Sequence, residues 1–282
     1  MSSYAISLLS VIGINVILAV SLNMITGFCG QFSLGHAAFF GTGAYAAALL
    51  ARAGSPFVLA LVGGALAAGL LGFLVGFASL RVRDDFLAIT TIGVGFLFIG
   101  FVRKQEWLGG EMGITGIPPT GLSIEGNAVL VLVIAALTIV LSLYLKRSWL
   151  GFSFLAVADD QDAAPTVGID VSAYKLAAFA LGTGLAGLAG GLYTYFTLFI
   201  TAEAFNFIVS VTIMSMVVIG GVGSTWGVAA AAVLLTLFPE FFRFINNFRL
   251  IFFGGLLLIV MRFSPGGLAG MVNWALKRRL AQ

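Results

Sequence analysis

Few side chains in this sequence could do chemistry, and those few stand inside long apolar stretches. Gln31, Ser33 and His36 lie close together at the start of one such stretch. His36 is the only histidine and Cys29 the only cysteine, which excludes an intrachain disulfide and a zinc site built from cysteines or histidine pairs. Inside a membrane, costly polar groups line a pathway or hydrogen-bond neighbouring helices. Both interpretations stay open for this group.

Other polar residues occupy apolar segments elsewhere in the chain. Asn23 shares one face of its expected helix with Asn15, and Thr90 and Thr91 stand side by side in a later segment. Each threonine could instead bond to the backbone of its own helix. With no pair of facing carboxylates inside these segments, an intramembrane enzyme is not favoured. The candidate pathway residues are Asn23, Gln31, Ser33, His36, Thr90 and Thr91.

The composition places these residues in a membrane protein. Of 282 residues, 60% are hydrophobic and 9% charged, against about 25% charged in ordinary soluble domains. Residues 1–51 and 204–239 contain no Asp, Glu, Lys or Arg, and about 20 apolar residues are enough for one spanning helix. A soluble enzyme and a nucleic-acid-binding protein are excluded. We expect an all-α polytopic membrane protein whose first span is retained rather than removed as a signal peptide.

Hydrophobic segments predict a bundle of about nine transmembrane helices, within a range of eight to ten. Residues 33–50 are short, rich in glycine and interrupted by His36, which indicates a broken or re-entrant helix near Ser33–Leu50. The predicted segments are Tyr4–Ile25, Ser33–Leu50, Pro56–Leu80, Phe86–Val102, Asn127–Leu145, Tyr174–Ile200, Phe205–Gly223, Thr225–Ile245 and Phe248–Arg262.

Basic residues predict the orientation of these spans, because lysine and arginine concentrate in cytoplasmic loops. Nine spans with the C-terminal Lys277–Arg279 in the cytoplasm leave the N-terminus outside. Five of the 14 basic residues then lie outside: Arg52, Arg103, Lys104, Arg243 and Arg249. The other nine lie inside: Arg81, Arg83, Lys146, Arg147, Lys175, Arg262, Lys277, Arg278 and Arg279.

Small residues recur four apart within the spans, as in Gly64–Ala68–Gly72–Gly76 and Thr183–Gly187–Gly191. Membrane helices associate through close backbone approach along such strips, so the strips predict tight helix packing. Several strips in one chain favour the compact body of a transporter or channel. We therefore assign residues 1–282 to a single transmembrane domain.

The loop over residues 146–173 is the longest piece outside the predicted spans, and the charge count places it in the cytoplasm. It contains Asp159, Asp160 and Asp162, followed by Ala163, Ala164 and Gly168. A short helix of this kind could dock into the cleft of another protein, although an ordinary solvated loop has the same composition. The sequence has no Gly-Lys pair and therefore no phosphate-binding loop of the ATPase type.

Within this loop, the pattern Asp162-Ala163-Ala164-x-x-x-Gly168 resembles the E-A-A-x-x-x-G signature of bacterial ABC-importer permeases, with Asp in place of Glu. In that family the segment forms the coupling helix that inserts into the ATPase subunit. Pro165 departs from the pattern. Because proline lacks a backbone donor, we expect the helix to stop near Ala164 or to restart there.

Longer blocks make the chain similar to branched-chain amino acid permeases of the LivM type. The first block is residues 30–45, which read GQFSLGHAAFFGTGAY; the others are residues 86–93 with 109–117, residues 220–227, and Pro265 with Gly267-Leu268. They follow one another in family order. One departure is the stretch Phe96–Ile99, where family members often carry Glu-Ile-x-x-Arg.

This resemblance implies a permease subunit of an ATP-driven importer in the cytoplasmic membrane of a bacterium or archaeon. Its implied partners are two ATPase subunits, a homologous second permease and a periplasmic or lipid-anchored solute-binding protein, with ATP and magnesium bound by the ATPases and no cofactor on this chain. Residues of the loop would then couple the ATPases to the spans: Asp159, Asp160, Asp162, Ala163, Ala164 and Gly168. The implied substrates are branched-chain or related amino acids.

Two alternatives stay open beside this interpretation. The same machine could carry urea or short amides, as relatives of the family do. The chain could also be a stand-alone channel or secondary carrier, which would be expected to bury ionisable groups or to contain inverted repeats with paired broken helices. Neither a convincing repeat nor a partner for residues 33–50 is evident in the second half of the sequence.

Overall fold

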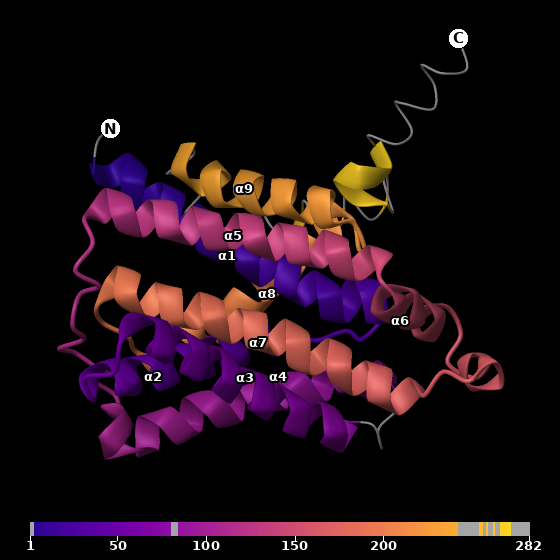
Figure 1. Cartoon of the computed structure of the whole chain (residues 1–282), viewed down its shortest axis with the longest axis horizontal. Coiled ribbons are helices and arrows are strands. Elements are labelled where there is room, and N and C mark those ends of the chain that lie inside the picture. Colours follow the sequence, from indigo (N-terminus) through magenta and orange to yellow (C-terminus); the bar gives the residue numbers. More distant parts are fainter. Residues whose placement is uncertain are drawn as a thin grey trace, which may run out of the picture.

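Nine α-helices form most of the part of the chain described by the computed structural model, which covers residues 3–79, 84–241, 254–255, 258, 262 and 266–271 (Figure 1). Their bounds are α1 Ser3–Asn23, α2 His36–Arg52, α3 Phe57–Ser79, α4 Asp84–Lys104, α5 Ile124–Arg147, α6 Trp149–Asp159, α7 Val171–Thr197, α8 Phe207–Gly220 and α9 Thr225–Phe241. Short turns are the π-helix η1 Met24–Phe28 and the 3₁₀ turns η2 Glu106–Leu108, η3 Ala164–Val167 and η4 Ala202–Phe205. The protein is an all-α polytopic membrane protein.

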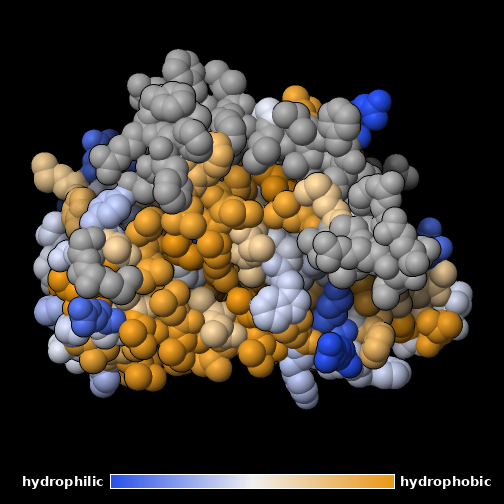
Figure 2. All heavy atoms as spheres, turned by 90° about the horizontal axis from the view of Figure 1, so that it is seen from above, coloured by the Kyte–Doolittle hydropathy of each residue, from blue (hydrophilic) through white to orange (hydrophobic). Residues whose placement is uncertain are grey.

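Eight of the nine predicted segments coincide with described helices. Six of these helices, α1, α3, α4, α5, α7 and α8 with their adjoining turns, are long and apolar enough to cross a membrane. The helices α2 and α9 are shorter, at 17 residues each. Most of the ninth predicted segment, Phe248–Arg262, lies outside the described residues, as do the C-terminal Lys277–Arg279. Apolar residues dominate the described part of the face seen in Figure 2.

Side-chain caps define where several helices begin. The Ser123 hydroxyl accepts a hydrogen bond from the Gly126 N–H at 3.1 Å, and the Asp170 carboxylate accepts one from the Ala173 N–H at 3.1 Å. At the start of α8, the Asn206 side chain accepts from a backbone N–H in the same way. Such caps satisfy amide groups that the first turn of a helix leaves without partners.

The described basic residues fall at two opposite ends of the bundle, grouped as the sequence predicted. Lys146, Arg147 and Lys175 lie at the end of α5 and the start of α7, where α6 also lies (Figure 1). Arg52 and the pair Arg103–Lys104 end α2 and α4 at the other side, where Arg103 forms an exposed ion pair with Glu203. The orientation prediction assigns the α6 end to the cytoplasm.

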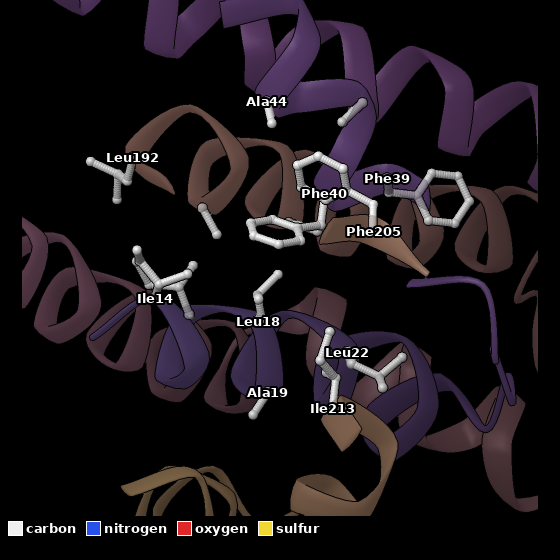
Figure 3. Packing of buried hydrophobic residues seen from close by; sticks show 14 of the residues in the cluster. Ile14, Leu18, Ala19, Leu22, Phe39, Phe40, Ala44, Leu192, Phe205 and Ile213 are labelled. Atoms are coloured by element: carbon white, nitrogen blue, oxygen red, sulfur yellow. The ribbon is translucent and has the colours of Figure 1, made fainter. Parts of the chain in front are cut away.

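The helix α2 lies inside the bundle, packed against α3, α4, α7 and α8. Its Phe39 meets the ring of Phe179 edge-on at a centroid distance of 5.6 Å. Its Phe40 meets the ring of Phe205 in the same way at 5.0 Å (Figure 3). Leu18 and Leu22 of α1 belong to the same cluster, shown in Figure 3 with the other labelled residues. Ring and aliphatic side chains therefore fill the space between α2 and its neighbours.

Small residues bring α3 and α7 together, as the predicted strips require. A Cβ added at Gly72 would collide with Thr183, and one added at Gly187 would collide with Gly64 and Ala68. These are the strips that start at Gly64 and Thr183 in the sequence. Close backbone approach of this kind stabilises helix pairs in a membrane.

The helix α4 is the least embedded of the six long helices. Only 17% of its most apolar window is buried, compared with 67% for α1. A Cβ added at Gly93, Gly95 or Gly100 would meet no atom within 4 Å. One face of α4 is therefore open, and between α4, α2 and α3 lies an apolar cavity of about 620 Å³ lined by Tyr45 and Phe98, among others.

Candidate functional site

The break between α1 and α2 has an irregular backbone inside the bundle. α1 continues into the π-helical turn η1, residues 30–35 are not helical, and α2 begins at His36. The Thr26 hydroxyl donates to the carbonyl of Gln31 at 3.0 Å, and the Gln31 N–H donates to the carbonyl of Ile25 at 3.2 Å. These bonds satisfy backbone groups that the break would leave bare, as membrane burial demands. The irregularity predicted near Ser33–Leu50 lies at the start of that segment, and from His36 the helix is continuous to Arg52.

Four helices meet around the first residue of α2. His36 Nε2 lies 2.8 Å from the hydroxyl oxygen of Ser21 on α1. The Ala37 N–H donates to the Ser210 hydroxyl of α8 at 3.0 Å, and the Leu34 N–H donates to the Thr91 hydroxyl of α4 at 3.0 Å. Side chains of α1, α4 and α8 thus hold the end of the break and the buried N-terminus of α2.

Three polar atoms near the break have no hydrogen-bond partner among the described residues, although all three are buried. They are Nδ1 of His36, Oγ of Ser33 and Nδ2 of Asn23. Buried polar atoms are normally paired, and exceptions are concentrated where a protein moves or binds something. Among the described residues, most of the buried side-chain polar atoms without a hydrogen-bond partner therefore lie around the break.

The structure brings most of the predicted pathway residues to this break. Ser33 and His36 border it and Thr91 bonds to it, whereas Gln31 contributes its backbone and is itself buried. Asn23 stands one turn before it, and its side-chain oxygen accepts from the Gly223 N–H at 2.9 Å.

Thr90 lies apart from this group. It points away from the break and donates to the carbonyl of Phe86 in its own helix, at 3.0 Å. The interpretation as a helix-bonding threonine, which the sequence left open, describes Thr90. In this conformation the other five side chains are enclosed within the chain, with exposed fractions of 4% or less.

Sequence reasoning missed three residues that the structure places here. Ser21 and Ser210 bond to the start of α2, and Lys146 donates from Nζ to the carbonyl of Gly223 at 2.6 Å. Serines are common in membrane helices, so nothing in their spacing singles them out. Lys146 ends a predicted span, so the sequence indicates only a basic residue that helps to orient the helices.

The loop between α5 and α7 folds into α6 followed by a compact turn. The Asp160 carboxylate accepts from the N–H groups of Asp162 and Ala163, both at 2.9 Å. Pro165 then stands in the first turn of η3, and Gly168 ends that turn with φ +83°. The chain therefore restarts as a 3₁₀ turn around Pro165, one of the two outcomes expected for that proline.

The predicted coupling residues divide between two faces of this turn. Asp159, Asp160, Asp162, Ala163 and Gly168 are exposed, whereas Ala164 is buried with an exposed fraction of 3%. Val167, which the sequence did not single out, is 74% exposed. The outward surface is therefore acidic with an apolar tip, and Ala164 anchors the turn to the bundle.

The inward face of the loop packs directly on the broken helix. Phe154 and Val157 of α6, together with Ala164, form a buried cluster with Phe28 and Cys29. At Gly30 in the break, an added Cβ would lie 3.3 Å from Ala158 Cα. The two segments that the sequence marked separately, the break and the loop, are parts of one packed unit.

Comparisons with known proteins agree with this architecture. The family described as "Branched-chain amino acid transport system / permease component" matches residues 4–261. The chain belongs to this permease family. It is 33% identical to a LivM high-affinity branched-chain amino acid transport system permease protein of Salmonella typhimurium, covering 95% of this chain and 71% of that protein. The corresponding protein of Escherichia coli K12 is 34% identical, with coverages of 94% and 69%.

More distant proteins are similar to this permease as well. A probable LivM branched-chain amino acid transport permease protein of Methanocaldococcus jannaschii is 25% identical over 71% of this chain and 66% of its own length. Among solved structures, PsaBC from Streptococcus pneumoniae in complex with Fab matches with a TM-score of 0.51 and 15% identity, covering 94% and 93% of the two chains. At that identity the likeness is one of fold.

Proposed function

We propose that this chain is the membrane-spanning subunit of an ATP-driven importer that moves branched-chain or related amino acids across the cytoplasmic membrane. The observation that carries the proposal is the family match over residues 4–261, supported by relatives named as high-affinity branched-chain amino acid permeases. The chain contributes the passage and leaves ATP hydrolysis to other subunits, in keeping with the absence of a phosphate-binding loop from its sequence.

The proposed complex contains two ATPase subunits, a homologous second permease and a periplasmic or lipid-anchored solute-binding protein. The ATPases would contact the outward face of the α6–η3 loop through the exposed acidic residues and Val167. This assignment puts the α6 end of the bundle and the C-terminus in the cytoplasm, with the solute-binding protein at the opposite end. The sequence supports that orientation, because it assigns nine basic residues to the α6 side and five to the other.

In the proposed mechanism, closure of the ATPases displaces the α6–η3 loop. Because Phe154 and Val157 pack on Phe28 and Cys29, the displacement reaches the broken helix without an intervening mobile linker. Packed clusters rearrange between discrete arrangements rather than deforming smoothly, so a small shift can switch the bundle between two states.

The pathway is proposed to run beside the break, and the described conformation keeps it closed. Ser33, His36 and Asn23 carry unpaired polar atoms that would gain partners when the passage opens. The open face of α4 offers the room for such a change, since α4 makes few contacts with the rest of the bundle. Apolar side chains around the adjoining cavity would suit the aliphatic part of a branched-chain amino acid.

Purification from native membranes in mild detergent, followed by reconstitution, tests the proposal. Two ATPase chains and a related permease are expected to co-purify, and the complex should take up radiolabelled leucine into vesicles only with ATP and the solute-binding protein. Uptake of urea or short amides instead would change the substrate. Uptake by the chain alone without ATP would show a stand-alone carrier and overturn the proposal.

A further inference from the structure

The turn between α8 and α9 is held by side chains from two other helices. α8 ends at Gly220 and α9 begins at Thr225, so Gly223 lies in the connection, with φ +81°. Its N–H donates to the Asn23 side-chain oxygen at 2.9 Å, and its carbonyl accepts from Lys146 Nζ at 2.6 Å. Both backbone polar groups of one glycine are thus bound by side chains of α1 and α5.

Further contacts hold the α8–α9 turn in this position. A Cβ added at Gly27 would collide with both Gly223 and Asn23, so the π-helical turn lies directly against the α8–α9 turn. One helical turn before Lys146, the Ser142 hydroxyl lies 3.0 Å from the Thr225 hydroxyl at the start of α9. These contacts leave little freedom for the turn to move independently of α1 and α5.

Lys146 stands between this turn and the segment that leads into the coupling loop. Its ammonium lies 5.7 Å from the centroid of the Phe28 ring, and Phe28 belongs to the cluster that α6 packs on. Ser148, two residues later, caps the start of α6. Lys146, near the end of α5, therefore contacts both the π-helical turn η1 and the α8–α9 turn.

A role in topology alone does not explain this placement. The neighbouring Arg147 is exposed and supplies a positive charge at the same depth. Lys146 instead turns inward, where its ammonium bonds to the carbonyl of Gly223 rather than to a carboxylate. Its partners are a carbonyl and an aromatic ring, which hold a cation in a defined position.

We propose that Lys146 is a positioning residue that transmits displacement of the α6–η3 loop to the α8–α9 turn and, through Asn23, to the broken helix. The inference rests on the proposed importer function and adds to it a named mechanical link. When the loop moves, the end of α5 moves with it, and the bond to Gly223 makes the turn follow. Without that bond the α8–α9 turn would no longer follow the loop, and fewer amino acid molecules would be moved per ATP hydrolysed.

The test uses the reconstituted complex and measures the amino acid moved per ATP hydrolysed. Lys146→Met removes the donor and keeps the chain length, and Lys146→Arg keeps a charged donor. Arg147→Met is the matched control, since it removes a charge at the same depth. Lys146→Met is expected to lower the ratio about tenfold, the size of a typical coupling between sites, while Lys146→Arg restores most of it and Arg147→Met leaves it unchanged.

A second variant covers the case in which Lys146→Met fails to assemble. Asn23→Ala removes the other bond to Gly223 and should lower the same ratio. Where both single variants assemble, the double variant should lose little more than either one, because both act on one turn. Wild-type ratios in Lys146→Met or Asn23→Ala, or an equal loss in Arg147→Met, would overturn the inference. A wild-type complex that does not couple uptake to ATP would instead overturn the proposed function.

Discussion

His36 is bonded across the helix break to Ser21, with 2.8 Å between His36 Nε2 and the Ser21 oxygen. The Ser21 hydroxyl also lies 2.8 Å from the carbonyl of Leu18, to which it donates its one proton. His36 must therefore donate from Nε2, which leaves Nδ1 as the ring atom without a partner in the described structure. The bond fixes the start of α2 against α1 at the place where the backbone ladder is interrupted.

Removing the Ser21 hydroxyl should destabilise the protein measurably. Ser21→Ala leaves both ring nitrogens of buried His36 unpaired, so we expect a loss of about 1 kcal/mol in the free energy of unfolding. Ser10→Ala is the matched control, because Ser10 is buried in the same helix and bonds only to its own backbone at Ile6. Denaturant titration in detergent micelles measures both. Equal effects of the two substitutions would show that the His36 bond adds nothing.

Close backbone approach leaves no room for a Cβ at Gly43 of α2. A Cβ at Gly43 would collide with the backbone of Gly187, and Gly43 also lies against α3, where a Cβ added at Gly64 would come within 2.7 Å of the Gly43 carbonyl oxygen. Gly43→Ala should therefore cost about 1–3 kcal/mol, as overpacking does. Gly93→Ala in α4 meets open space and should be neutral or slightly stabilising, since alanine is the better helix former. Thermal denaturation of the two variants checks this, and a Gly43→Ala protein as stable as wild type would contradict the packing.

The sequence predicted the helices and the break for physical reasons that are local. Spans follow from uninterrupted apolar composition, and the short, glycine-rich segment around His36 could not form a full span. The loop was singled out by Asp162, Ala163 and Gly168, and the restart at Pro165 follows from its missing N–H. Each of these features is encoded within about 20 neighbouring residues.

The contacts that join these features are not local, and they were not predicted. The Asn23–Gly223 bond joins residues 200 positions apart, and Lys146–Gly223 joins residues 77 apart. Burial of Ala164 depends on how α6 lies on the π-helical turn, which no residue pattern in the loop encodes. A lysine at a span end is compatible with a topological charge and with an inward hydrogen bond, and only the packing distinguishes them.

At the end of the bundle opposite α6, two connecting segments are joined by a small bridge. Ile114 and Ile200 exchange backbone hydrogen bonds at 2.9 and 3.2 Å. Gly113 has φ +78°, and an added Cβ would collide with the Ile200 carbonyl. Gly113→Ala should break the bridge, whereas Gly116→Ala, with φ +72° and open space, should cost only the backbone strain of about 1 kcal/mol.

Amide hydrogen exchange tests this prediction at the two bridging residues. In Gly113→Ala the Ile114 and Ile200 amides should exchange faster than in wild type, and in Gly116→Ala they should stay protected. Unchanged protection in Gly113→Ala would mean that the bridge survives the substitution.

The exposed tip of the α6–η3 loop gives the sharpest test of the proposed docking of the ATPase subunits. Val167 is 74% exposed, so Val167→Arg should leave the fold intact and reduce ATPase co-purification at least tenfold, about 1.4 kcal/mol, as for a central interface residue. Ala164→Arg instead forces a charge among Phe154, Val157 and Phe28 and should lower the yield of folded protein. Met112→Arg, at an 86% exposed position near the opposite end, controls for adding a charge. Wild-type amounts of ATPase bound to the Val167→Arg protein would show that the subunits dock elsewhere.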